Sequence, residues 1–94
     1  MKIELKKFGN ILISRKDGKE ALAAIHNTLS KLGDEELLEI DFLGVSTFTP
    51  SWADEFITPI KQKYGLKVIL LNTSNPSVQA TLELLETISK MQKV

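Results

Sequence analysis

The chain contains no cysteine and has one histidine, His26. The absence of cysteine excludes disulfide bonds and thiolate metal sites, and it fits a protein of the reducing cytosol. A lone histidine has no second histidine or cysteine with which to share a metal ion, so we expect His26 to be structural. We therefore expect neither a metal site nor a cofactor.

Long apolar runs are also missing. The first residues alternate between polar and apolar side chains and lack the apolar core of a signal peptide, and no run approaches the roughly 18 apolar residues that span a bilayer. We expect a cytoplasmic protein without a membrane partner.

The chain has no excess of charge of either sign. Twelve basic and twelve acidic residues give a formal net charge of zero, and no window holds a concentrated basic patch, which argues against nucleic acid as a partner. The 94 residues, 43% of them hydrophobic, fit one domain covering residues 1–94.

The most informative stretch is residues 36–56. The apolar run at 37–42 predicts a strand that is covered on most of both faces. Thr49 is a good N-cap, and Pro50 suits the first position of a helix. Ser51 then falls in the first helical turn, where the backbone dipoles stabilise negative charge.

Two strand signals precede the first helix. Residues 1–8 alternate as a half-buried strand does, and residues 11–13 form a second short apolar run. The Gly9-Asn10 pair between them is typical of a turn, so we expect the two strands to pair as a hairpin.

Three helices are expected. The first begins at Ser14 and ends at Gly33, and its apolar residues recur at helical spacing. The second begins at Pro50, and Pro59 inside it predicts a kink or a restart with Thr58 as a new N-cap. Its apolar stripe consists of Trp52, Ala53, Phe56, Ile57 and Ile60.

The last part of the chain contains one more strand and one more helix. Residues 66–71 are apolar and rich in β-branched side chains, which favours a strand. Asn75 and Pro76 then begin a helix that runs to about Lys90. The resulting order is strand, strand, helix, strand, helix, strand, helix. It predicts an α/β fold with a central mixed sheet of about four strands and three helices.

The run DFLGVSTFTPSWADE, residues 41–55, resembles the STAS-like family of unknown function, small bacterial domains related to anti-sigma factor antagonists. In STAS domains, a strand that ends in Asp is followed by a hydrophobic step and by Asp-Ser-Ser/Thr-Gly at the start of a helix. Asp41, Val45 and Ser51 match this pattern, and Ser51 takes the place of the phosphorylatable serine. The chain departs from the motif at Thr49, Pro50 and Trp52. The Ser14-Arg15 pair is also similar to the family, and the resemblance extends over essentially the whole chain.

The resemblance implies a non-enzymatic regulatory module that binds a partner protein, such as a histidine-kinase-like ATPase or an anti-sigma factor. Ser51 becomes the candidate for phosphorylation. No nucleophile and base are readable as a pair, so we expect no catalytic residues. The expected partner surface consists of Gly44, Ser46, Thr47, Thr49, Ser51, Trp52, Asp54 and Glu55.

Two alternatives stay open. The helix start at Thr49–Ser51 is also suited to binding an anion, a nucleotide or another small ligand. Leu84 and Met91 lie on a second apolar stripe of the last helix, which fits either a broadly buried helix or a homodimer surface.

Overall fold

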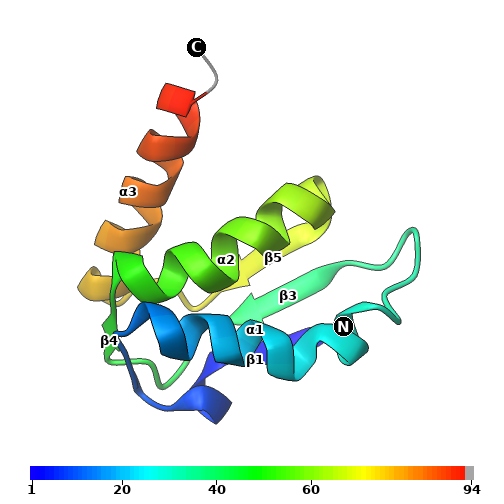
Figure 1. The fold of residues 1–94 in the computed structure, drawn as a ribbon, viewed down its shortest axis with the longest axis horizontal. Helices are drawn as coiled ribbons and strands as arrows, with labels where there is room; N and C mark the ends of the chain where they lie inside the picture. Colours follow the sequence, from blue (N-terminus) through cyan, green and yellow to red (C-terminus); the bar gives the residue numbers. More distant parts are fainter. Residues whose placement is uncertain (93–94) are drawn as a thin grey trace.

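The structure, a computed structural model, describes residues 1–92 and has an α/β fold with three α-helices (Figure 1). Its strands form two small sheets, one of three strands and one of two. The expected α/β fold with three helices is therefore confirmed. The single mixed sheet of about four strands is not, because every strand pairing is parallel and the strands divide between two sheets.

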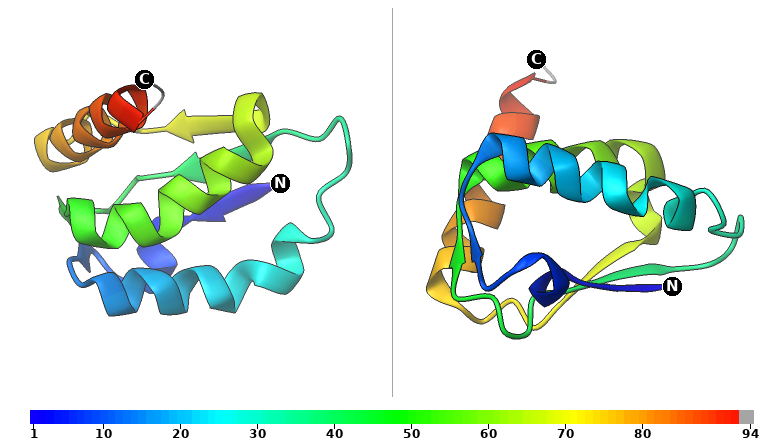
Figure 2. Two further views of the ribbon diagram at one scale, coloured as in Figure 1. Left: turned by 45° about the horizontal axis from the view of Figure 1, so that its top comes forward. Right: turned by 60° about the horizontal axis from the view of Figure 1, so that its bottom comes forward.

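The larger sheet has the order β1-β3-β5, formed by Lys2–Glu4, Leu38–Asp41 and Val68–Leu71. Its register places Ile3, Ile40 and Leu70 side by side. Because side chains alternate along a strand, these residues share one face. Helices α1 (Arg15–Leu29) and α2 (Pro50–Tyr64) lie side by side over one face of this sheet, as Figure 2 shows.

The smaller sheet pairs β2 (Ile11–Leu12) with β4 (Thr47–Phe48). The expected hairpin between the first two strands is wrong. The chain leaves β1 through a 3-10 helix, η1 (Leu5–Phe8), and Gly9 has a φ of 122°. This path buries Leu5 completely and places the Phe8 ring 5.7 Å from that of Phe56, so burial of apolar side chains outweighs a short hairpin.

An aromatic cluster fills the core between the larger sheet and the two helices. The rings of Trp52 and Phe56 stack with centroids 4.8 Å apart, and Phe48 lies 5.8 Å from Trp52. Phe42 extends the cluster from the end of β3 to Phe48, at 5.2 Å. The core therefore unites α2 with segments from both sheets.

The helix starts follow the sequence signals. The Ser14 hydroxyl accepts a hydrogen bond from the Asp17 N–H at 3.0 Å, and the Asn75 side chain accepts from the N–H of Ser77 at 2.8 Å at the start of α3 (Pro76–Gln92). Both predicted N-caps are confirmed. Helix α1 ends earlier than expected, at Leu29, where Ser30 takes the C-cap position.

Pro59 lies inside α2 without ending it. The helix runs from Pro50 to Tyr64, so the predicted restart at Thr58 is wrong. The Thr58 hydroxyl donates to the Asp54 carboxylate at 3.0 Å, one turn back, instead of capping a new helix. Gly65, with a φ of 53°, ends α2 as predicted, and the 3-10 helix η2 (Gly65–Lys67) leads into β5.

Helix α3 extends away from the rest of the domain (Figure 1). Its first turns are anchored because Val78 and Thr81 are buried, whereas Met91 near its end is 69% exposed. Among residues 1–92, no helix combines the length and the apolar character needed to cross a membrane.

Helices α1 and α2 approach each other closely at Gly18. A Cβ atom added there would lie 2.5 Å from the backbone oxygen of Trp52. Only glycine lets the two helix backbones come this close, so Gly18 fixes the distance between the two helices that cover the sheet.

Replacing Gly18 with alanine should destabilise the protein. Alanine favours a helix by about 1 kcal/mol, but overpacking against rigid backbone typically costs more, and we expect a net loss of about 2 kcal/mol. Urea unfolding followed by circular dichroism measures this loss in the free energy of unfolding. Gly33→Ala is the matched control, because its Cβ would meet nothing closer than 3.7 Å. Equal stability of Gly18→Ala and wild type would contradict the assigned contact.

Candidate functional site

The N-termini of all three helices gather around β4, at the end of the molecule toward which β3 runs (Figure 1). The carboxyl ends of parallel strands are where α/β folds place their sites. The segment from Val45 to Ser51 runs through this end of the molecule, so its contacts define the candidate site.

The first half of this segment is tied to the connection between η1 and β2. The carbonyl oxygen of Asn10 accepts hydrogen bonds from the Ser46 N–H at 2.8 Å, the Ser46 hydroxyl at 3.0 Å and the Thr47 N–H at 3.2 Å. The polar groups of Ser46 and Thr47 thus hold the loop in place, although Ser46 stays exposed.

The second half is tied to α3. The Phe48 N–H donates to the Ser77 hydroxyl at 2.9 Å. The Phe48 carbonyl accepts from the hydroxyls of Ser77 at 3.1 Å and Thr81 at 2.6 Å. Sequence reasoning did not identify Ser77 or Thr81, because a serine and a threonine at i, i+4 in a helix give no signal until the strand opposite them is known.

Thr49 joins β2 to the start of α2. Its hydroxyl donates to the carbonyl of Ile13 at 2.6 Å and accepts from the Trp52 N–H at 3.5 Å. The predicted N-cap is confirmed. Since the hydroxyl already donates to one segment and accepts from another, it has little hydrogen-bonding capacity left, and Thr49 can contact a partner mainly through its remaining half-buried surface.

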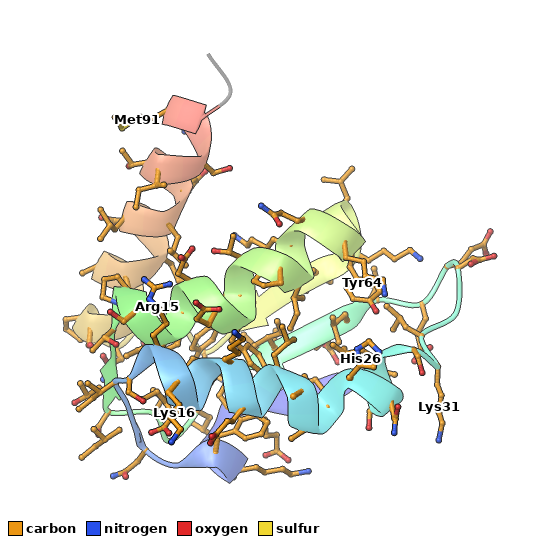
Figure 3. The ribbon with its side chains drawn as sticks, viewed as in Figure 1. Arg15, Lys16, His26, Lys31, Tyr64 and Met91 are labelled. Carbon is orange, nitrogen blue, oxygen red and sulfur yellow. The ribbon has the colours of Figure 1, made fainter. Side chains whose placement is uncertain are left out.

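Ser51 belongs to a polar face of α2 that also carries Asp54 and Glu55. Positions i, i+3 and i+4 lie on the same side of a helix. The Arg15 guanidinium reaches over from α1, and its Nη1 donates to both carboxylates at 3.0 Å (Figure 3). These hydrogen bonds, to Glu55 and then to Asp54, raise the pKa of Arg15. Ser51 is half-buried, and within residues 1–92 its hydroxyl has no hydrogen-bond partner.

Trp52 does not belong to the surface. Its side chain is 1% exposed and packs in the aromatic core, so it cannot contact a partner in this structure. The same apolar spacing that placed it in the helix stripe explains its burial. Gly44 is exposed, in the turn that closes with a hydrogen bond from the Val45 N–H to the Phe42 carbonyl, and its φ is 87°.

A polar cluster centred on Asp41 lies beside this site. The carboxylate is 3% exposed. It accepts hydrogen bonds from the side-chain amide of Asn72 at 2.8 Å and from the Leu43 N–H at 3.0 Å, and the Lys2 ammonium lies 3.4 Å away. The sequence motif identified Asp41 but not these partners, which come from β1, from the loop after β3 and from the loop after β5. Asp41 therefore connects the loops that follow β3 and β5.

The same contacts lower the pKa of Asp41, chiefly the hydrogen bond from Asn72, then that from Leu43, with Lys2 adding a smaller effect. As the pH falls, the unfolded chain takes up the proton first. The carboxylate thus favours folding at neutral pH, and its contribution is lost as the pH falls from about 3.9, the ordinary Asp value, through the lower folded pKa.

Replacing Asp41 with asparagine should lower the urea midpoint at pH 7, and the difference from wild type should shrink below about pH 4. Glu39→Gln is the control, since it removes a half-buried carboxylate from the same strand that has no ion pair within residues 1–92. A midpoint difference for Asp41→Asn that does not depend on pH would contradict the role assigned to the carboxylate.

His26 lies in the last turn of α1, at the far end from the helix starts, as its label in Figure 3 shows. The structure does not bring it near Ser51. Within residues 1–92, no three His, Cys, Asp or Glu side chains are grouped as a metal ion would require.

The fold and its loop site define a small parallel α/β domain. A family model described as "STAS-like domain of unknown function (DUF4325)" matches residues 17–78, about two thirds of the chain. The chain belongs to this family. The match is shorter than the whole-chain resemblance expected, and it leaves out Arg15 and most of α3. Searches of curated proteins and of solved structures gave no match.

Proposed function

We propose that the protein is a non-enzymatic regulatory module that binds a partner protein through the start of α2 and the adjoining loops. The observation that carries this proposal is the half-buried polar cluster of Ser51, Asp54 and Glu55 beside the exposed Arg15. Membership in the STAS-like family supports a regulatory role. A histidine-kinase-like ATPase or an anti-sigma factor is the partner class that the family resemblance suggests.

The contacts of the loop support binding rather than catalysis. The hydroxyls of Ser46 and Thr49 donate to backbone carbonyls, and so do those of Ser77 and Thr81. A hydroxyl that donates in this way is not activated by a base, as a nucleophile would be. The hydrogen bonds instead hold a rigid loop, which limits the entropy lost when a partner binds.

The partner surface that we propose differs from the one expected from sequence by the loss of Trp52. It keeps the exposed or half-buried residues of the loop and of the first turns of α2, and it gains Arg15, which is 55% exposed at its side chain. The proposed surface consists of Arg15, Gly44, Ser46, Thr47, Thr49, Ser51, Asp54 and Glu55.

Phosphorylation of Ser51 would act through this cluster. A phosphate adds a charge of roughly −1.5 to −2 on the helical face that already holds two carboxylates. Arg15 is the cation that lies against them, at 3.0 Å from each. The phosphate would compete for the guanidinium and repel Asp54 and Glu55, so the exposed charge pattern would change without unfolding the core.

This rearrangement can be tested before a partner is known. We expect Ser51→Asp to shift the Arg15 guanidinium resonances in NMR spectra, because the new carboxylate lies one turn before those that Arg15 binds. Ser74→Asp, in an exposed loop, is the matched control and should leave them unchanged. If Ser51→Asp leaves the Arg15 signals where they are in wild type, the proposed switch is wrong.

Partner binding provides the second test. The protein should be used to capture its partner from the native host, and the affinity of the purified partner should then be measured by calorimetry. We expect Ser51→Asp to weaken binding about tenfold, which corresponds to about 1.4 kcal/mol, and Ser74→Asp to change it by less than about twofold. Equal affinities for both variants would remove the start of α2 from the partner surface.

The alternative of an anion or nucleotide site at Thr49–Ser51 makes a different prediction. Titration with phosphate and nucleotides would then shift amide signals confined to residues 44–54. The nearby carboxylates of Asp54 and Glu55 oppose this alternative, since they repel an anion and already occupy Arg15.

A further inference from the structure

Helix α3 presents a stripe of apolar side chains to solvent. Leu84 is 43% exposed, Ile88 40% and Met91 69%. Their spacings of four and three residues place them on one face of the helix. Figure 3 shows Met91 at the far end of α3, away from the sheet and the other two helices.

The last turns of α3 are packed less closely against the rest of the domain than its first turns. Leu82 and Leu85 still pack against the core, but every residue from Glu86 to Met91 is exposed. Helices in proteins gain most of their stability from packing an apolar face, and short helical segments are marginal in water by themselves. The stripe is therefore the face of α3 that a partner would stabilise.

The stripe continues into a groove of about 360 Å³ between α2 and α3. Ile88 belongs to both the stripe and the groove, and the half-buried Leu85 adds further apolar surface to the groove. A helix placed on the stripe would therefore also cover the apolar edge of the groove at Leu85 and Ile88, whereas the remaining accessible lining is polar.

Charged residues beside the stripe indicate what binds there. Glu83 and Lys90 are seven residues apart, about two helical turns, so they lie on the same flank of α3. The small side chains of Ala80 and Thr87 lie between this flank and the stripe. Lys90 is 3.8 Å from Glu86 within the helix, but both are largely exposed, and such a pair is weak enough to rearrange.

This arrangement is complementary to itself when two copies of α3 run antiparallel. With a twofold axis near Thr87, Leu84 of one copy faces Met91 of the other, and Ile88 lies near its own counterpart. Glu83 of each copy then lies beside Lys90 of the other. A parallel pair would instead put these charged flanks on opposite sides of the interface, where Glu83 and Lys90 could not pair with each other.

We propose that α3 is a self-association surface, on which a second copy of this chain binds by antiparallel pairing of the two helices through Leu84, Ile88 and Met91. None of these three residues belongs to the surface around Ser51, although Asp54 of that surface also lines the groove between α2 and α3.

The test is the mass of the full chain in solution, measured by analytical ultracentrifugation over a wide range of concentration. We expect wild type to change from monomer to dimer as its concentration rises, and Ile88→Glu to stay a monomer. Leu66→Glu is the control, because Leu66 is fully exposed in η2, far along the chain from the stripe, and it should associate as wild type does. A monomer at every concentration, or a dimer of Ile88→Glu, would overturn the proposal.

A charge exchange tests the antiparallel arrangement. Lys90→Glu should weaken the dimer about fivefold, since it puts two acidic pairs at the interface. The double variant Glu83→Lys with Lys90→Glu exchanges the two charges and should restore the wild-type dimer affinity. If the double variant associates no better than Lys90→Glu alone, the antiparallel arrangement is wrong. Far-UV circular dichroism of each variant reports whether α3 keeps its helix.

Discussion

The contact between the backbones of Gly18 and Trp52 is the constraint on which the rest of the structure depends. It lets α1 and α2 lie close enough to share one face of a three-stranded sheet. With the helices at this distance, the Trp52 ring can stack on Phe56 and meet Phe48, and the Arg15 side chain can reach across to α2. The core and the polar face at Ser51 thus follow from one glycine in α1.

The sequence predicts well where a local signal decides the structure. Ser14, Thr49 and Asn75 cap their helices as predicted, because a cap needs only one side chain and the N–H groups that follow it. Sequence-based prediction fails where contacts between segments far apart in the chain decide the structure. The hairpin was wrong because β1 and β2 pair with β3 and β4, and β4 was not predicted because its two residues carry no periodicity of their own.

The candidate site shows the same difference between local signals, which were predicted, and long-range contacts, which were not. The motif located Ser51 and Asp41, and the helix start placed Ser51 in the first turn of α2. Neither signal could identify Arg15 as the partner of Asp54 and Glu55, or Asn72 as the partner of Asp41, since these contacts join residues more than 30 positions apart. Trp52 was expected at the surface from its place in the motif, whereas the apolar spacing of α2 already favoured its burial in the core.

The Phe48 carbonyl accepts two hydrogen bonds from α3, and this has a consequence for how α3 can move. Ser77 and Thr81 both donate to this one oxygen, so the first two turns of α3 are fastened to the residue directly before the Thr49 cap of α2. A displacement of Phe48 would therefore carry the first turns of α3 with it, and a small rotation at the base of a long helix becomes a larger movement toward its other end. The start of α2 and the far end of α3 are therefore linked through Phe48 and the helix itself, although no side chain belongs to both regions.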